Sequence, residues 1–207
     1  MLLTLKEYQR MYKVINSIVE NEGWHTAHSC IYFSYFGAYI LKKCYNIEAE
    51  IRCGHAAYCI GGDKKIILFG ELNHRGNFSD KSVSFHCWIE AKGWLIDFLA
   101  PNFPQMQSKE FDVESLPSYM LQKPLTEMSP SNQLDKRGDF YLEFNSRLAK
   151  ENLSFLFKHI GYLDMAKLCA DWYTKPPKKI HDQLKISNKI GTEMIVKLRG
   201  NRVTGKW

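Results

Sequence analysis

The chain has 207 residues and a formal charge of +6, with 45% hydrophobic, 24% charged and 14% aromatic residues, which is ordinary for a globular protein. The sequence has no run near the ~18 apolar residues of a membrane span, and charged residues interrupt its N-terminus too early for a signal peptide. Six cysteines without an export signal predict reduced thiols, so we expect a cytoplasmic protein.

The first predicted element is a helix that runs from about Thr4 to Asn21. Thr4 and Glu7 have the spacing of a capping box, in which each side chain satisfies a backbone N–H of the helix start. Apolar residues then recur every three or four positions, as in a helix with one buried face. These residues are Leu5, Tyr8, Met11, Tyr12, Ile15, Ile18 and Val19.

A second helix is predicted over residues 30–43, because this segment is apolar on nearly all sides, as in a buried helix. Thr26 or Ser29 is placed to cap its start. Cys30 would lie in the first turn, where unpaired backbone N–H groups and the helix dipole lower the pKa of a thiol. The same N–H groups can bind an oxyanion, so Cys30 is the candidate nucleophile.

Short strands are predicted next, separated by turns. They cover Glu48–Cys53, Ala56–Ile60 and Lys65–Phe69, with a turn at residues 61–63. A polar, glycine-containing loop follows over residues 70–82. Loops of this kind border functional sites on rigid scaffolds.

Residues Ser84 to Asp97 predict two antiparallel strands joined by a tight turn at Lys92-Gly93. Because side chains alternate along a strand, His86 and Asp97 share a face and become diagonal neighbours within reach of one another. An imidazole beside a carboxylate is half of a catalytic triad. The expected register pairs Ala91 with Trp94, Ile89 with Ile96 and Trp88 with Asp97, and it puts Cys87 on the core face.

The order of Cys30 on a helix, His86-x-Trp88 on one strand and Gly93 to Asp97 on the next resembles the papain-like superfamily, in its transglutaminase-like branch. The string from Phe85 to Pro101 is more similar still to an uncharacterised bacterial family. That family is known only as a domain of unknown function, number twenty-twenty-six of its series, and is grouped with papain-like folds. The resemblance covers roughly residues 24–103.

The resemblance implies an α+β, papain-like fold in which the nucleophile helix packs on an antiparallel sheet, with further helices at both ends. It implies a triad of Cys30, His86 and Asp97. Papain has a glutamine shortly before its cysteine, but this chain has none there, so the second oxyanion donor is left open. The residues that would supply it or line the cleft are His25, His28, Trp24 and Trp88.

We expect one domain over residues 1–207, with the papain-like core at roughly 24–103 and a helical, basic region at roughly 140–207. Between them, prolines interrupt an irregular segment with short helical pieces near residues 113–120. Helices are predicted at 145–159 and 162–173, with Gly161 as the stop between them. A strand is expected at 193–198.

Much of the positive charge lies near the C-terminus, and we interpret it as a solvated basic surface rather than a nucleic-acid interface. No nucleic-acid-binding motif and no membrane segment accompany it. The residues concerned are Lys175, Lys178, Lys179, Lys185, Lys189, Lys197, Arg199, Arg202 and Lys206.

The predicted function is a thiol hydrolase that acts on a peptide, amide or (thio)ester acyl group through a thioacyl enzyme. Two alternatives use the same fold: transfer of the acyl group to an amine, and an inactive binding module. His25, His28 and Cys30 lie close in sequence, but their spacing matches no common zinc pattern, so no metal is expected. No cofactor is expected either, and the oligomeric state and the substrate are left open.

Overall fold

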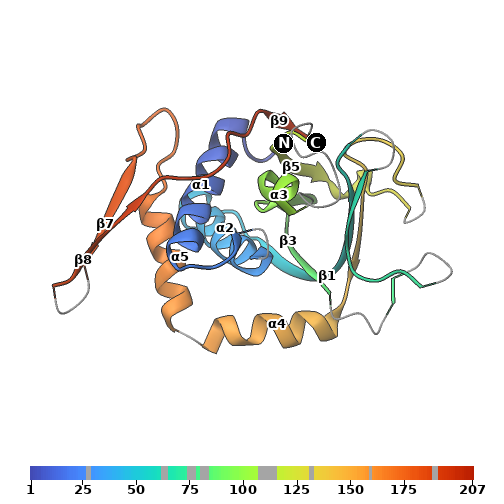
Figure 1. The fold of residues 1–207 in the computed structure, drawn as a ribbon, viewed down its shortest axis with the longest axis horizontal. Helices are drawn as coiled ribbons and strands as arrows, with labels where there is room; N and C mark the ends of the chain where they lie inside the picture. Colours follow the sequence, from blue (N-terminus) through green and yellow to red (C-terminus); the bar gives the residue numbers. More distant parts are fainter. Residues whose placement is uncertain are drawn as a thin grey trace.

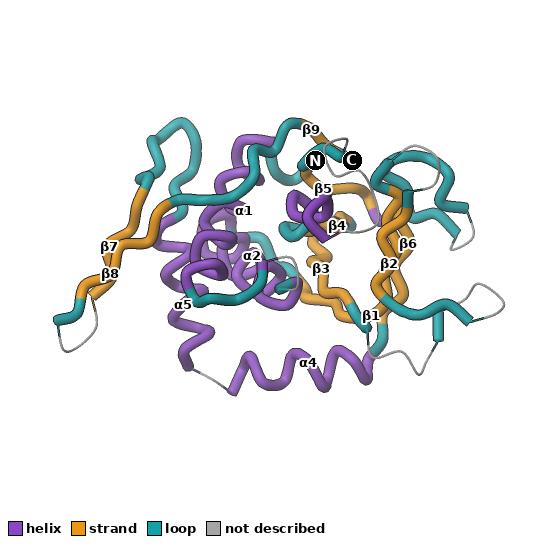
Figure 2. The backbone as a smooth tube through the Cα atoms, viewed as in Figure 1, coloured by secondary structure: helices purple, strands orange, loops and turns teal. Residues whose placement is uncertain are grey.

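The computed structural model of the chain is an α+β structure in which a cluster of helices packs against a mixed sheet (Figure 1). Figure 2 shows the division, with most of the helical backbone on one side, the strands of the main sheet on the other, and β7 and β8 beyond the helices. The structure describes residues 1–26, 29–61, 65–73, 78–79, 84–106, 116–130, 133–158, 160–187 and 191–207.

The helices and strands are interspersed along the chain. The α-helices are α1 (Leu5–Asn21), α2 (Cys30–Tyr45), α3 (Phe103–Met106), α4 (Ser146–Lys158) and α5 (Ile160–Trp172), and the short 3-10 helices are η2 (Ala100–Asn102) and η4 (Leu125–Glu127). The strands are β1 (Glu50–Cys59), β2 (Ile66–Phe69), β3 (His86–Ala91), β4 (Trp94–Asp97), β5 (Tyr119–Pro124), β6 (Phe140–Phe144), β7 (Gln183–Ser187), β8 (Glu193–Lys197) and β9 (Gly205–Lys206).

Helix α1 begins with the predicted capping box. The Glu7 N–H donates to the Thr4 hydroxyl at 3.3 Å, and the Thr4 N–H donates to the Glu7 carboxylate at 2.8 Å. The apolar stripe is buried from Tyr8 to Val19, whereas Leu5 at its start is 37% exposed. The predicted stripe is therefore confirmed except at Leu5, which lies in the solvated first turn.

Helix α2 begins at Cys30, as predicted, with Ser29 as its N-cap residue. The predicted side-chain cap is wrong, because the Ser29 hydroxyl donates to the His25 carbonyl (2.8 Å) and makes no bond to the helix. The first N–H groups of α2 are thus left without a side-chain acceptor from Ser29. Lys42 and Lys43 lie in the last turn, where their positive charges interact favourably with the negative end of the helix dipole.

A glycine lets α2 approach the sheet closely. A Cβ atom at Gly37 would overlap the Phe98 ring and touch Ile89 of β3. Because both neighbours are buried side chains in a packed core, neither has free space to move into. Gly37 therefore fixes how near α2, with Cys30 at its start, lies to β3.

The main sheet has the strand order β2-β1-β3-β4-β5-β9, and β6 also pairs with β1. Strand β1 is continuous, not the two short strands expected, because it changes partner along its length. Its first half pairs with β3 up to Gly54, and its second half pairs with β6 and β2. All of these pairs are antiparallel except β5 with β9, so the sheet is mixed.

The β3–β4 hairpin has the predicted register, with Ile89 opposite Ile96 and Ala91 opposite Trp94. Its two turn residues have positive φ angles, 49° at Lys92 and 77° at Gly93, as a two-residue hairpin turn requires. Both faces of β3 are buried from His86 to Ile89, so the hairpin lies inside the molecule.

The second half of the chain departs more from expectation. The helical pieces expected near residues 113–120 are not seen where the structure describes that segment, because β5 begins at Tyr119; residues 107–115 lie outside the described part. Gly161 lies inside α5, not between two helices. The strand expected near residue 193 is β8, which forms with β7 a two-stranded sheet that projects from the helical side (Figure 1).

No helix in the described part of the chain is long and apolar enough to cross a membrane.

Candidate active site

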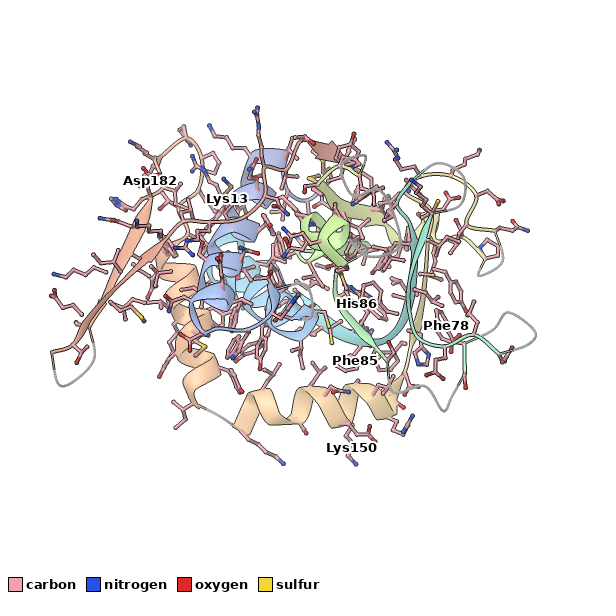
Figure 3. All side chains as sticks on the ribbon, in the orientation of Figure 1. Lys13, Phe78, Phe85, His86, Lys150 and Asp182 are labelled. Atoms are coloured by element: carbon pink, nitrogen blue, oxygen red, sulfur yellow. The ribbon has the colours of Figure 1, made fainter. Side chains whose placement is uncertain are left out.

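Three segments bring Cys30, His86 and Asp97 together. Cys30 is the first residue of α2, His86 is the first residue of β3, and Asp97 is the last residue of β4. All three are buried, with 7%, 0% and 2% of their surface exposed. Figure 3 shows His86 in the interior, between the helices and the sheet. We call these three residues the trio.

The two ring nitrogens of His86 have different surroundings. Nε2 lies 2.6 Å from Oδ2 of Asp97, and Oδ1 of that carboxylate accepts the Leu99 N–H at 2.9 Å. The Tyr8 hydroxyl donates to the main-chain carbonyl of Asp97, which anchors the end of β4 to α1. Asp97 occupies Nε2, whereas Nδ1 is buried, makes no hydrogen bond of good geometry to the described residues, and is the nitrogen left for the interaction of His86 with Cys30. This division leaves one nitrogen to position the ring and the other to exchange a proton.

The Cys30 sulfur is surrounded by groups that favour its thiolate form. The neighbouring Cys87 thiol has the largest influence on the pKa of Cys30, which is lowered to about 5. Burial opposes this shift, but the hydrogen bond and the positive charge of His86 and the Cys87 backbone N–H also favour the thiolate. The interaction with Cys30 raises the pKa of Cys87 well above its ordinary value.

The charge of the trio favours a protonated His86. Burial alone would lower the pKa of this imidazole. The negative charge of Asp97 and the hydrogen bond to it, together with the bond to Cys30, outweigh burial and raise the pKa of His86 to about 10. Between pH 5 and pH 10 the two groups therefore favour a thiolate–imidazolium pair.

Aromatic rings enclose the imidazole. The Phe69 ring of β2 stacks on His86 with a centroid distance of 4.1 Å, while Tyr58 and Phe103 approach its edge at 5.7 and 6.3 Å. Rings on three sides exclude water and restrict rotation of the imidazole. These rings therefore hold the His86 imidazole in the orientation in which it faces Asp97.

Tyr58 has a polar end inside this enclosure. Its hydroxyl is buried and makes no hydrogen bond of good geometry to the described residues. Burial raises the pKa of Tyr58 well above its usual range, and the nearby charges of Asp97 and Cys30 raise it further. Tyr58 thus presents a neutral O–H group next to the trio.

The residues expected to line the cleft are placed unequally. Trp24 is half-buried and stacks on Tyr32 of α2 at 4.0 Å, and His25 beside it is exposed, so both lie just before α2 and Cys30. Trp88 is buried, but its indole N–H donates to Glu90 at 3.0 Å rather than to a member of the trio. His28 lies outside the described residues. The structure assigns none of the four as the second oxyanion donor.

The sequence patterns missed the thiol that most affects Cys30. The hairpin pattern puts Cys87 on the core face as filler, yet the thiols of Cys30 and of its cross-strand partner Cys53 both raise the pKa of Cys87. The only sequence signal is its position next to His86. The role of Tyr58 was missed as well, because residues in separate strands meet only once β1 pairs with β3. Among the described residues, no group of three or more His, Cys, Asp or Glu side chains is arranged to hold a metal ion.

The chain can now be compared with known proteins. The model of the family described as "Protein of unknown function (DUF2026)" matches residues 4–207. A crystal structure of a genomics target is similar over 100% of this chain and 98% of its own, with 35% sequence identity and a TM-score of 0.86. None of the curated proteins is detectably similar. Because the family model spans nearly every residue, this chain belongs to the DUF2026 family.

Proposed function

We propose that this protein is a papain-like thiol hydrolase that cleaves an amide or (thio)ester bond through a thioacyl intermediate on Cys30. The observation that carries the proposal is the buried trio: a cysteine at a helix start whose pKa is lowered by neighbours that include a histidine, and that histidine's Nε2 2.6 Å from a buried carboxylate. Catalytic cysteines are activated by a neighbouring histidine that a third group orients.

In the first half of the proposed reaction, the Cys30 thiolate attacks the substrate carbonyl carbon. A carbon–sulfur bond forms, and the carbonyl electron pair moves to the oxygen. The Cys30 backbone N–H, in the first turn of α2, is an orphan donor that can bind this oxyanion. When the tetrahedral species collapses, the carbon–nitrogen bond breaks and Nδ1 of His86 gives its proton to the leaving amine.

In the second half, neutral His86 takes a proton from water as the water oxygen attacks the thioester carbon. The carbon–sulfur bond breaks, an acid leaves, and the thiolate–imidazolium pair is restored. Asp97 holds the His86 ring in one orientation throughout. An amine in place of water would give acyl transfer on the same intermediate.

The proposal is tested by the rate at which iodoacetamide labels each cysteine between pH 5 and pH 9, read by peptide mass spectrometry. We expect Cys30 to label at least tenfold faster than Cys44 at pH 6. Cys44 is the more exposed of the two, but burial raises its pKa, so its thiol stays protonated and unreactive at this pH. His86→Gln keeps a donor for Asp97 but cannot hold the proton, and should remove the advantage. His55→Gln, a change at another fully buried histidine, should not.

Equal labelling of Cys30 and Cys44 at pH 6, in wild type and in both variants, would overturn the hydrolase proposal. The alternative would then be a binding module that keeps the fold without the chemistry. If labelling behaves as expected, the next measurement is hydrolysis of amide and thioester substrates by the wild type and by Cys30→Ala.

A further inference from the structure

A cavity of about 680 Å³ is lined by segments that lead to the trio in sequence or pack against it, although none of the three residues of the trio lines it. One wall is formed by Trp24, His25 and Thr26, which lead into α2 and end four residues before Cys30. The lining also includes Asn102 and Gln105, which flank in sequence Phe103, whose ring approaches the edge of His86. The cavity thus adjoins both the segment that carries the nucleophile and the segment that covers the base. Its volume is in the range of ligand-binding sites.

The floor of the cavity presents hydrogen-bond donors. The Tyr12 hydroxyl donates to Oδ1 of Asn102 at 2.6 Å, and Nδ2 of Asn102 donates to Oδ1 of Asn16 at 3.1 Å. Both carboxamide oxygens therefore already have partners. Nδ2 of Asn16 makes no hydrogen bond to any described residue, although Asn16 is only 5% exposed. Two N–H donors of a nearly buried side chain are left for a ligand.

One positive and one negative side chain line the cavity, and they form an ion pair with each other. Arg199 and Glu20 both line it and pair with each other, with Nη1 of Arg199 3.0 Å from Oε1 of Glu20. A ligand carboxylate would compete with Glu20 for this guanidinium, and a ligand ammonium would compete with Arg199. An uncharged group with carbonyl acceptors meets neither obstacle and matches the free donors of Asn16.

The cavity wall also has an aromatic component. Trp24 stacks on Tyr32 at 4.0 Å and is further packed against Tyr162, so the indole is held in place. An aromatic face next to amide donors suits a peptide, which offers apolar side chains and backbone carbonyls together. A purely aliphatic acyl chain would leave the Asn16 donors without a partner.

We propose that this cavity binds an uncharged peptide segment of the substrate, with a backbone carbonyl on Nδ2 of Asn16, and presents the next amide bond to Cys30. The proposal rests on the proposed function, because it names the substrate class of that site as peptides. It assigns specificity to Asn16, which is a binding residue and takes no part in the bond-breaking steps.

The test measures binding of N-acetylated, C-amidated tri-alanine to Cys30→Ala by isothermal titration calorimetry, with hexanoamide as the aliphatic comparison. Asn16→Asp replaces the free donors with an oxygen and keeps the acceptor for Asn102, so the fold should persist. Asn21→Asp adds the same charge to the exposed end of the same helix and is the matched control. We expect Asn16→Asp to weaken peptide binding at least tenfold, Asn21→Asp to leave it within twofold, and hexanoamide not to bind.

A second readout uses the wild type alone and does not depend on any variant folding. Saturating peptide should slow iodoacetamide labelling of Cys30 and leave Cys44 unaffected, because Cys44 lies near α5 and outside the cavity. Absence of peptide binding, equal binding to both Asp variants, or no protection of Cys30 would overturn the cavity proposal. The two proposals fail in different ways. Asn16→Asp should still show fast labelling of Cys30 at pH 6, because the substitution leaves the trio in place. A wild type without this fast labelling would contradict the proposed function rather than the cavity proposal.

Discussion

Two fully buried histidines lie on adjacent strands of the same sheet, and their surroundings differ. His86 pairs in register with Gly54, so His55, the next residue of β1, points to the opposite face. Figure 3 shows the two sides, with His86 on one side of β1 and Phe78, which stacks on His55 at 4.9 Å, on the other. Neither ring nitrogen of His55 has a hydrogen-bond partner among the described residues, and the Glu143 carboxylate is 3.9 Å away.

The comparison shows that burial alone does not make a histidine chemically useful. The carboxylate of Asp97 is itself buried, lies 2.6 Å from the imidazole, and is held by a backbone N–H. Glu143 is 39% exposed in its side chain and longer, so water screens its charge. A short, fixed and desolvated carboxylate is therefore the feature that separates the trio from the His55 site.

The largest expected effect comes from exchanging the two carboxylates for amides. Asp97→Asn removes the charge that stabilises the imidazolium of His86, so less thiolate forms on Cys30. We expect iodoacetamide labelling of Cys30 at pH 6 to fall at least about tenfold. Glu143→Gln is the matched change at the other histidine and should alter the rate by less than twofold. Equal effects of the two variants on Cys30 labelling would contradict the conclusion that the Asp97 carboxylate sets the trio apart from the His55 site.

The next effect concerns Gly54, the residue opposite His86. An added Cβ would overlap the main-chain carbonyl oxygen of Glu143, which cannot move without displacing β6. We expect Gly54→Ala to lower the free energy of unfolding by about 3 kcal/mol, measured in urea. Gly161→Ala in α5 meets no atom within 4 Å and should raise stability by up to ~1 kcal/mol. Hydrogen exchange should rise in β6 more than in β4, since the added Cβ overlaps the main chain of β6.

The pH dependence of stability gives a third, smaller effect. The pKa of His86 is raised from 6.5 to about 10, so its contribution is complete below pH 6.5 and is lost as the pH rises toward 10. The pKa of Cys30 is lowered from 9.0 to about 5, so its contribution is complete above pH 9 and is lost as the pH falls toward 5. The two slopes cancel between pH 6.5 and 9, which predicts a plateau.

This plateau is measured as the difference in unfolding free energy between the wild type and the double variant Cys30→Ala/His86→Gln. We expect the difference to fall by roughly 2 kcal/mol from pH 6.5 to pH 5, and by a smaller amount from pH 9 to pH 10. A difference that stays flat from pH 5 to pH 10 would show that the pair is not charged in the folded protein.

The smallest effect is expected at the partnerless histidine. His55→Phe replaces two buried nitrogens that lack hydrogen bonds and keeps a ring to stack on Phe78. Such a replacement removes a desolvation cost, so stability should change by no more than ~1 kcal/mol, and toward higher stability. Thermal unfolding measures the shift. A large loss would mean that His55 has a partner that stabilises it.

The parts of the site that the sequence predicts are local. The turn at Lys92-Gly93 sets the register of the β3–β4 hairpin, and the register puts His86 beside Asp97 within eleven residues of sequence. The start of α2 follows from the apolar run after Cys30. Each of these inferences needs one periodicity and one turn, which a short segment contains in full.

The parts that sequence reasoning missed depend on pairing between distant segments. Strand β5 is held by β4 on one side and β9 on the other, and its own residues give no regular alternation. Cys87 meets Cys30 only when α2 packs on β3, and this packing depends on the space at Gly37. Gly161 was taken for a helix stop because glycine is common there, but its neighbours in α5 outweigh that preference.

The cavity has a consequence for the time at which the protein becomes competent during synthesis. Its walls come from Tyr12 and Asn16 near one end of the chain and from Arg199 and Asn201 near the other. The Asn201 N–H bonds to the Tyr12 hydroxyl at 3.0 Å, a contact that spans 189 residues. A nascent chain can therefore assemble the β3–β4 hairpin on the ribosome long before it can close the cavity. Contacts of such long range form late in folding, so translation itself delays closure of the cavity relative to the trio.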